Sequence, residues 1–365
     1  MQKKTVLYEE HLSLGAMMGE FATWLMPLKY ESERNEHLAV RKMAGLFDVS
    51  HMGILLIAGA ETLDVLQRLL TSDISQLKVG KACYSLMLDE DAGIIDDLIC
   101  YRIKNEAYLM IVNAANLQKD FLHISNIIKG ARAYIENISS QKALIALQGP
   151  SSEEILSGVF LGKAPKRNEI KEMNLLNINK NALVARTGYT GESGFEIMIE
   201  KDQACSLWKE LLKVGKPYGL SPCGLIARDS LRLEAGLLLH GSDITAKNNP
   251  LEADLMHFVK FEKSPLFIGC DALLRKIREG SKKKLVGFVL LEKGILRAHC
   301  KIFSREGDLI GEITSGTLLP RHVFSIGLGY IKIPYSQVGT KVCIDIRGRN
   351  ICAAVSKRSH LVKYE

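Results

Sequence analysis

Two adjacent carboxylates interrupt an apolar stretch that runs from Gly93 to Tyr101 and reads Gly-Ile-Ile-Asp-Asp-Leu-Ile-Cys-Tyr. The Ile and Leu content predicts a buried strand, on which Asp96 and Asp97 should point to opposite faces. Burying an unpaired carboxylate costs several kcal/mol, or else the group keeps its proton. One interpretation is that at least one of them takes part in chemistry. The other is that both are paired structurally, to an arginine or to backbone amides.

A glycine-rich segment places further polar groups together between Arg186 and Glu196, with the sequence Arg-Thr-Gly-Tyr-Thr-Gly-Glu-Ser-Gly-Phe-Glu. Its glycines permit tight turns and close backbone approach to a ligand. Tyr189 offers a ring face and a hydroxyl, and Glu196 can accept paired N–H bonds from a heterocycle. An ordinary hairpin turn with solvated glutamates explains the pattern equally simply. The segment is not Gly-x-Gly-x-x-Gly, so a dinucleotide fold is not expected.

A third candidate group lies on the predicted helix 222–235, where Arg228 and Arg232 are four residues apart on one face, beside Asp229. An arginine near a helix start gains nothing from the helix dipole, so its position indicates a specific anionic partner. That partner could be a substrate carboxylate or an acid such as Asp97. A surface ladder of Arg and Glu side chains is the alternative.

Other polar residues occur singly in apolar surroundings. The segment 45–53 contains Asp48, Ser50 and His51, and a lone histidine of this kind is more often a satisfied structural group than a catalyst. Tyr84 and Asn113 could line a pocket or make ordinary hydrogen bonds in the core. The sequence contains no Gly-x-Ser-x-Gly elbow, P-loop or His-Glu-x-x-His motif. Carboxylates, Tyr, Asn and Arg together suit binding a polar heterocycle and positioning it for attack on a reactive partner.

Hydrophobic periodicity predicts the elements that carry these residues. The two apolar runs 94–103 and 107–113 are expected to form a hairpin, and 262–284 is expected to be a charged linker. Short β-like runs between 285 and 356 are typical of a small barrel or sandwich. The other expected helices are 7–20, 61–70, 114–128, 151–158 and 203–215, and the other expected strands are 53–58, 143–148, 182–187 and 195–199.

The composition indicates a globular protein of two or three domains, with 365 residues, 47% of them hydrophobic and 24% charged. No stretch approaches the ~20 apolar residues of a membrane span, and no signal peptide is evident, so a cytoplasmic protein is expected. The net charge of +7 favours acidic partners, but no nucleic-acid-binding signature accompanies it. The eight cysteines should be buried free thiols, and the nine histidines show no ligand spacing, so no metal is expected.

Several of these segments, in this order, resemble the aminomethyltransferase, or T-protein, family of the glycine cleavage system. The resemblance covers nearly the whole chain. The matching stretches are 45–53, 93–99, 146–150, 186–192 with 194–196, 227–229 with 231–236, Gly241 with Asp243, and 313–316.

This resemblance implies an α+β fold of three domains arranged like a cloverleaf around a central tetrahydrofolate site, with a C-terminal β-barrel. The expected parts are a folate-binding domain made of 1–55 and 141–250, a second α+β domain at 56–140, a linker at 251–284 and the barrel at 285–365. It also implies transfer of a one-carbon unit from the aminomethyl-dihydrolipoyl arm of H-protein to tetrahydrofolate, with release of ammonia and formation of 5,10-methylenetetrahydrofolate. The expected partners are lipoylated H-protein, bound transiently, and the glycine cleavage complex, but neither nucleic acid nor membrane.

The resemblance also assigns roles by position. The family's essential aspartate, the second of its Asp-Asp pair, falls on Asp97, which is expected to be catalytic. Its folate-contacting glutamate falls on Glu196 and its arginine on Arg228. The remaining folate-binding positions fall on Tyr84, Asn113, Tyr189, Met52 and Tyr101.

The sequence departs from the family pattern at His240, where the family has tyrosine, and Tyr364 is a candidate for a ligand-contacting tail tyrosine. One alternative is a folate-binding accessory protein of iron–sulfur maturation on the same fold. Its Lys-Gly-Cys-aromatic-x-Gly-Gln motif is matched only in part by Lys81-Ala-Cys-Tyr-Ser-Leu. The folate half of a dimethylglycine- or sarcosine-type oxidase is another alternative, but it would need a flavin domain.

Overall fold

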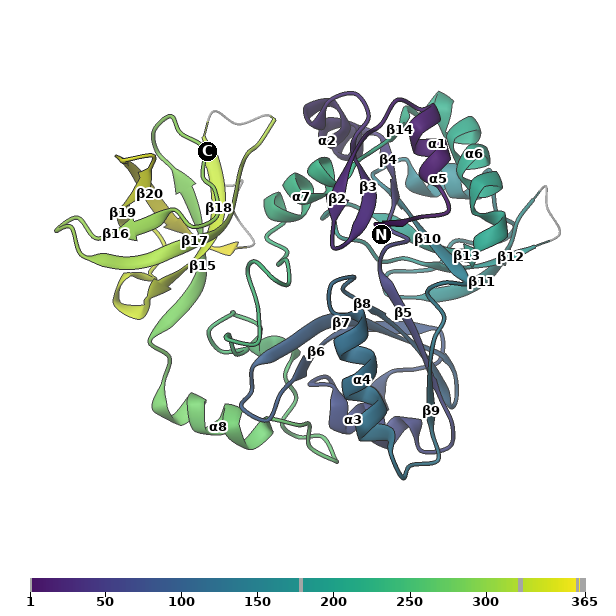
Figure 1. The fold of residues 1–365 in the computed structure, drawn as a ribbon, viewed down its shortest axis with the longest axis horizontal. Helices are drawn as coiled ribbons and strands as arrows, with labels where there is room; N and C mark the ends of the chain where they lie inside the picture. The colour runs from purple at the N-terminus through teal and green to yellow at the C-terminus, as the bar shows by residue number, and fades with distance from the viewer. Residues whose placement is uncertain (1, 177–179, 321–323, 359–360, 362–365) are drawn as a thin grey trace. The chain divides into compact units, whose positions relative to one another are not determined.

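A computed structural model describes residues 2–176, 180–320, 324–358 and 361 (Figure 1). Tyr364 therefore lies outside the described residues. The chain divides into two compact units. The first unit is Met1–Ser85 with Asp97–Arg228, and the second unit is Leu86–Asp96 with Asp229–Glu365. The two neighbouring aspartates thus belong to different units. The expected domain boundaries stay a prediction.

The first unit contains a six-stranded sheet in the order β11-β12-β13-β10-β4-β14. Its pairs are antiparallel except for β4 and β14, which run parallel. The apolar faces of β10 and β13 pack with helices α5 and α6 around the buried Trp208. The strands are β4 (Ala44–Asp48), β10 (Lys142–Gln148), β11 (Ile170–Asn174), β12 (Asn181–Ala185), β13 (Gly194–Glu200) and β14 (Leu220–Pro222). The helices are α1 (Tyr8–Ser13), α2 (Glu33–Lys42), α5 (Ser152–Ser157) and α6 (Ala204–Gly215). Helix α7 (Leu225–Glu234) begins in this unit, and its residues from Asp229 onward belong to the second unit.

The N-terminal segment differs from the predicted helix 7–20. Helix α1 ends at Ser13, and Gly15 follows in the left-handed region with φ of +73°. A glycine in this conformation ends a helix at little cost. The next residues form β2 (Met17–Phe21), in a three-stranded sheet with β3 (Trp24–Lys29) and β1 (Lys3–Lys4).

A five-stranded sheet in the order β6-β7-β8-β5-β9 carries the two aspartates. The predicted hairpin is confirmed, with β7 at Ile94–Lys104 and β8 at Ala107–Val112. The other strands are β5 (Gly53–Ala58), β6 (Lys81–Leu88) and β9 (Tyr134–Asn137). Helices α3 (Thr62–Leu69) and α4 (Leu117–Ile128) pack on each other, and α4 also packs on β9. Both helices carry the apolar stripe that the sequence predicts.

The second unit contains a closed barrel in the order β15-β18-β17-β16-β19-β20, drawn in green to yellow in Figure 1. This confirms the barrel and excludes the sandwich. The strands are β15 (Lys283–Leu290), β16 (Lys301–Phe303), β17 (Leu309–Leu318), β18 (Ser325–Lys332), β19 (Lys341–Ile346) and β20 (Arg349–Ser356). Short 3-10 helices lie at Ile74–Gln76, Lys201–Gln203, Lys216–Tyr218, Met256–Phe258 and Ile333–Tyr335.

The charged segment 262–284 is not an irregular linker throughout, because it contains helix α8 (Cys270–Glu279). Cys270, Ala272 and Leu273 are buried, whereas the basic residues of this helix lie in its last turn. Basic side chains there stabilise a helix end through its dipole. Composition indicated the charge correctly but hid the apolar stripe.

Candidate active site

Asp97 lies on one face of β7 and accepts hydrogen bonds from two neighbouring strands. The Tyr84 hydroxyl on β6 donates to its Oδ2 at 2.9 Å, and the Asn113 Nδ2 donates to its Oδ1 at 3.0 Å. The pairing of Ile99 with Ile111 brings Asn113 opposite Asp97, two residues further along. The two neutral donors fix the carboxylate. Because Asp97 is only half-buried, a ligand can still reach it. The residues Asp97, Tyr84 and Asn113, predicted separately, form one cluster.

Asp96 has a different environment, as strand alternation predicts. Its side chain is fully buried in the second unit, where the His240 Nδ1 lies 4.0 Å from its Oδ1. The His240 Nε2 contacts the carbonyl oxygen of Ile94 at 3.2 Å. Structural pairing to an arginine or to backbone amides was one of the two interpretations, and His240 is a neighbour that this interpretation did not name. His240, which stands where the family has tyrosine, therefore lies beside Asp96, the first aspartate of the pair.

Gly93 explains how the loop beside Asp96 is held. A Cβ at this position would lie 2.2 Å from the carbonyl oxygen of Ala246, so only glycine fits. The next residue, Ile94, donates its backbone N–H to the Asn248 carbonyl at 3.0 Å. The glycine that precedes the acidic pair is thus needed for backbone packing inside the second unit.

Glu196 on β13 is held by two hydroxyl groups. Thr187 donates to its Oε2, and the Tyr101 hydroxyl lies 3.4 Å from the same oxygen and 2.9 Å from the Thr187 hydroxyl. Burial, and then the Glu196 charge, raise the pKa of Tyr101 well above its usual range, so this phenol keeps its proton. Asp97 and Tyr101 share one face of β7, four residues and roughly 13 Å apart at about 3.3 Å per residue. One strand face therefore links the two carboxylate clusters.

Arg228 stacks on Tyr189, with its guanidinium carbon 4.8 Å from the ring centroid. Burial lowers the pKa of Arg228, while the charges of Glu196 and Tyr189 act against this shift. The Nη1 atom is buried without a hydrogen-bond partner among the residues that the structure describes. An arginine beside an aromatic face and a carboxylate, with one N–H direction unused, can donate to a bound ligand. Glu196 is therefore an acidic neighbour of Arg228, and this half-buried side chain does not belong to a surface ladder.

The start of α7 is fixed by Glu36, and this fixes Arg228 one turn later. The Glu36 Oε2 accepts the backbone N–H of Gly224 at 2.7 Å, and its Oε1 accepts that of Tyr30 at 2.7 Å. Gly224 packs so closely that a Cβ would lie 2.2 Å from the Leu28 carbonyl oxygen. A carboxylate at a helix N-terminus satisfies an otherwise free N–H.

His51 has an unpaired polar atom near Arg228. Its side chain is 3% exposed, and its Nδ1 is buried without a hydrogen-bond partner among the described residues. Burial, and then the Arg228 charge, lower the pKa of His51 to about 4, so the ring is neutral at pH 7. The Phe21 ring meets it edge-on at 5.4 Å. The prediction that this histidine is a satisfied structural group does not account for the unpaired nitrogen.

Asp48 anchors the segment that carries His51. Its carboxylate accepts hydrogen bonds from Thr5 Oγ1 at 2.6 Å, from the Ser50 backbone N–H at 2.9 Å, and from His11 Nε2 at 2.9 Å. Burial acts to raise the pKa of Asp48, but the His11 hydrogen bond and charge lower it below its ordinary value. Ser50 Oγ also contacts the Leu144 carbonyl at 3.2 Å. Asp48 and Ser50 are therefore structural residues.

Three residues that sequence reasoning did not single out hold the glycine-rich loop. Thr187 fixes Glu196, Gln148 accepts the Thr190 hydroxyl at 2.8 Å, and Arg41 donates to the Thr190 carbonyl at 2.7 Å. The Gln148 Nε2 also donates to the Thr187 carbonyl at 3.2 Å. Gln148 lies at the end of β10, next to Gly149, in the stretch 146–150 that resembles the family. This position could have identified it as a candidate from the sequence.

Met52 is half-buried directly before β5, whose Gly53 pairs with Val112. The same register places Met52 opposite Asn113, at the edge of the Asp97 cluster. All eight predicted site residues thus belong to the first unit. They form a cluster around Asp97 and a cluster around Glu196. Their roles in binding and catalysis stay a prediction.

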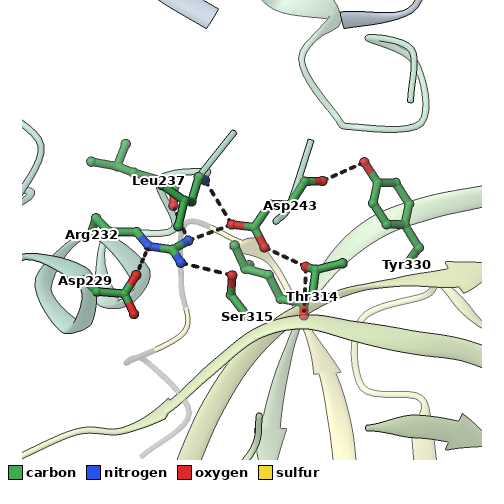
Figure 2. Close-up of polar contacts among 9 residues, drawn as sticks. Asp229, Arg232, Leu237, Asp243, Thr314, Ser315 and Tyr330 are labelled. Atoms are coloured by element: carbon green, nitrogen blue, oxygen red, sulfur yellow. Dashed lines mark hydrogen bonds and ion pairs between the residues drawn. The ribbon is translucent and has the colours of Figure 1, made fainter. Parts of the chain in front are cut away.

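Arg232 belongs to a separate, buried network, which Figure 2 shows. Its guanidinium donates to Asp243 Oδ2 at 2.6 Å, to Asp229 Oδ1 at 2.7 Å and to the Ser315 hydroxyl at 2.9 Å. Its Nη1 also donates to the Leu237 carbonyl at 3.1 Å. This side chain is 2% exposed and fully occupied, so it holds α7 to the barrel strand β17 rather than binding a ligand.

The described residues contain no group of three or more His, Cys, Asp and Glu side chains that could hold a metal ion. Within the same ranges, no helix has the length and apolar character needed to cross a membrane. The eight cysteines are free thiols, but five of them are half-buried rather than buried. The sequence did not distinguish these two groups.

The chain matches two family models that together cover most of its length. Residues 7–263 match the GCVT N-terminal domain, and residues 283–361 match the glycine cleavage T-protein C-terminal barrel domain. The chain belongs to the glycine cleavage T-protein family. Both the order of the motifs and the closed barrel agree with this membership.

Relatives of this T-protein chain match it over nearly the full length. An aminomethyltransferase of Symbiobacterium thermophilum is 42% identical over 97% of this chain and 96% of its own. One of Halothermothrix orenii is 43% identical over 97% of this chain and 99% of its own. The crystal structure of glycine cleavage system aminomethyltransferase T from Bartonella henselae is 35% identical, covers 98% of both chains and has a TM-score of 0.92. The expected mixed α and β fold with a C-terminal barrel is confirmed.

Proposed function

We propose that this T-protein transfers a one-carbon unit from the aminomethyl-lipoyl arm of H-protein to tetrahydrofolate, with the residues of the first unit as its active site. The chain is an aminomethyltransferase of the glycine cleavage system, as its family and its curated relatives indicate. The reaction would release ammonia, form 5,10-methylenetetrahydrofolate and leave dihydrolipoyl H-protein. The observation that carries the proposal is that one face of β7 presents both Asp97 and Tyr101, and that Tyr101 contacts Glu196. The two fixed carboxylates of Asp97 and Glu196 are thereby expected to lie within the length of one extended ligand.

Glu196 is suited to bind the amino and ring N–H groups of a pterin. Thr187 and Tyr101 occupy one of its oxygens, which fixes the carboxylate and leaves acceptor positions for a ligand. A charge-assisted pair of hydrogen bonds to a planar heterocycle is both strong and directional. Tyr189 offers a ring face nearby, and the Arg228 Nη1, which has no partner within the described part of the chain, can donate to a ligand oxygen. This buried donor favours a polar ligand over an apolar one.

Asp97 is suited to the transfer step. A fixed, half-buried carboxylate can orient the folate nitrogen that attacks the iminium-like carbon, accept its proton, and stabilise the positive charge that develops. Tyr84 and Asn113 hold both carboxylate oxygens in place through neutral hydrogen bonds. The attacking atom in this scheme is the folate nitrogen, so no cysteine or serine side chain acts as a nucleophile. Tetrahydrofolate is a cosubstrate here, and H-protein supplies the lipoyl group.

The macromolecular partner in this proposal is a lipoylated, acidic H-protein that binds transiently. The net charge of +7 supports association with an acidic carrier through steering. The residues that dock the carrier are not assigned. The iron–sulfur accessory function has less support, because the family models and the curated relatives favour the transferase. A catalytic role of Asp97, as proposed here, would also go beyond what a binding function alone requires.

The proposal is tested by ammonia release from aminomethyl-loaded H-protein, with and without tetrahydrofolate. The wild-type protein should release ammonia quickly only when tetrahydrofolate is present. Asp97→Asn keeps the shape but removes the charge, and it should lower turnover by at least ~100-fold, a typical general-base or electrostatic contribution. Asp96→Asn is the matched control on the opposite face, and it should mainly lower stability. Equal turnover in wild type and Asp97→Asn would contradict the assignment.

A further inference from the structure

The barrel of the second unit carries two cysteines directly opposite each other on adjacent strands. Cys343 on β19 pairs with Cys352 on β20 in an antiparallel register that extends to the turn, where Ile346 pairs with Arg349. Arg347 and Gly348 connect the strands with positive φ values of +55° and +79°. A two-residue turn of this kind matches the strand twist and fixes the register. The opposition of the two cysteines is therefore set by the hairpin itself.

Both thiols lie on the outer face of the barrel. Val342 and Ile344 on β19, and Ala353 and Val355 on β20, are part of the buried barrel core. Side chains alternate along a strand, so Cys343 and Cys352 point outward, and both are half-buried. They lie on the same face of the hairpin and remain within reach of small molecules.

The hydrogen-bond pattern identifies the type of pair. Val355 donates its backbone N–H to the Thr340 carbonyl at 2.9 Å, which makes Thr340 and Val355 a hydrogen-bonded position. Positions alternate, so three residues further along the two cysteines form a non-hydrogen-bonded pair. Consistently, the Cys352 carbonyl accepts from Leu291 on the opposite side of its strand, at 2.9 Å. Non-hydrogen-bonded pairs have Cα atoms about 4.5 Å apart, within the ~4.4–6.8 Å range of disulfides.

We propose that Cys343 and Cys352 form a reversible disulfide-exchange site on the barrel, with low-molecular-weight disulfides as its oxidant. One cysteine thiolate attacks a sulfur of the disulfide, which forms a mixed disulfide and expels one small thiolate. The other cysteine thiolate then attacks the protein sulfur and expels the second. The protein loses two electrons and two protons, and the disulfide is reduced to two thiols. This site is separate from the proposed active site and does not depend on it.

The chain offers a matched control in Cys83 and Cys100, on the adjacent strands β6 and β7. These two thiols contact each other, but Cys100 is fully buried. The contact with Cys83 and burial raise the pKa of Cys100 well above its usual value, so this thiol stays protonated and unreactive. The two cysteines lie close together in both pairs, but small molecules can reach both thiols only in the Cys343–Cys352 pair.

The test uses the full-length chain, reduced, desalted and incubated with oxidised glutathione at pH 8, followed by thiol counting and non-reducing peptide mapping. The wild-type protein should lose two of its eight thiols, with a link between Cys343 and Cys352 that dithiothreitol reverses. The Cys83→Ser/Cys100→Ser variant should also lose two thiols, out of its remaining six, and form the same link between Cys343 and Cys352. Cys352→Ser should instead retain glutathione on Cys343, because the resolving thiol is absent.

Three results would overturn the proposal. The first is glutathione retained on Cys343 in the wild-type chain, which would mean that Cys352 cannot reach the mixed disulfide. The second is a Cys83–Cys100 link that forms first. The third is the survival of all eight thiols under conditions in which an unfolded control is oxidised.

Discussion

The two arginines of helix α7 have the same charge, but Arg232 is buried and Arg228 is half-buried, and their hydrogen bonding differs. Arg232 donates to two carboxylates, a hydroxyl and a carbonyl, and thereby holds the helix to the barrel (Figure 2). Arg228 stacks on Tyr189 and leaves a buried N–H unused among the described residues. A buried arginine whose donors are all satisfied holds structure, whereas one with a free donor is a candidate for ligand binding.

The same contrast applies to the neighbouring aspartates. Asp96 is fully buried beside His240, while Asp97 is half-buried and accepts hydrogen bonds from two neutral donors. One residue of displacement along the strand changes the face, and with it the unit that the side chain contacts. Charge alone therefore does not separate the candidate site residues of this chain from the structural ones, whereas hydrogen bonding and exposure differ between them.

The largest expected effect concerns the saturated arginine. Arg232→Met leaves the Asp243 carboxylate buried without its cation, and removing one partner of a buried ion pair costs about 3–5 kcal/mol. We expect that loss in the free energy of unfolding measured in urea. The Arg232→Met/Asp243→Asn double variant should recover much of it, because no uncompensated charge remains. A loss below ~1 kcal/mol in the single variant, the scale of a surface pair, would mean that this network is not structural.

The next effect is the pH dependence that His51 contributes to stability. Its pKa of about 4 in the folded chain lies below the ordinary 6.5, so the unfolded chain binds a proton first as the pH falls. Stability from this group is complete above pH 6.5 and is lost between pH 6.5 and 4, by roughly 3 kcal/mol. His51→Asn removes the titration. Unfolding free energies measured at pH 7 and pH 4 should therefore fall less in the variant than in wild type. An equal fall in both proteins would show that His51 is not held neutral by burial.

A smaller effect is expected for the carboxylate that would bind the pterin. Glu196→Ala should weaken tetrahydrofolate binding by roughly 1.5–3 kcal/mol, the scale of a hydrogen bond to a charged group. Because Thr187 and Tyr101 keep each other as partners, the fold should survive. Thr187→Val is the matched control, since it loosens Glu196 without removing it and should have a weaker effect. Isothermal titration that gives an unchanged affinity for Glu196→Ala would remove this residue from the site.

The smallest effect concerns the carrier protein. Exposed charges are screened over about 10 Å at 0.1 M salt, so the KM for H-protein should rise between low and moderate salt. The affinity for tetrahydrofolate, which depends on half-buried groups, should change less. A KM that is independent of salt would indicate a largely apolar docking surface, and net charge would then be a poor guide to the partner.

Much of the architecture was predictable from the sequence because short-range hydrophobic periodicity determines many of its helices and strands. The hairpin of β7 and β8, the stripes of α3 and α4, and the alternating strands of the barrel each follow from hydrophobic periodicity. The strand β2 was missed because Met17–Phe21 continues the apolar pattern of α1, and only Gly15 marks the break. Helix α8 was predicted only as a solvated helix end within the linker, because basic residues dominate its last turn.

The candidate site was predictable in its residues but not in its contacts. Asp97, Glu196 and Arg228 stand out as charges in apolar or glycine-rich segments. Thr187 and Gln148 carry no charge, and their roles depend on pairings between β10, β13 and the loop that no short window reveals. The partner of Asp96 could not be predicted either, because His240 lies 144 residues away in the sequence and meets it only after folding.

The central claim is that Arg228, which has an unused donor among the described residues, binds tetrahydrofolate, and that the saturated Arg232 does not. Isothermal titration calorimetry with tetrahydrofolate tests it directly in wild type, Arg228→Gln and Arg232→Met/Asp243→Asn. The account predicts that Arg228→Gln raises the Kd by at least ~10-fold, the loss of one hydrogen bond to a charged group, while the double variant binds as wild type does. A Kd that is unchanged in Arg228→Gln, or raised equally in both variants, would contradict it.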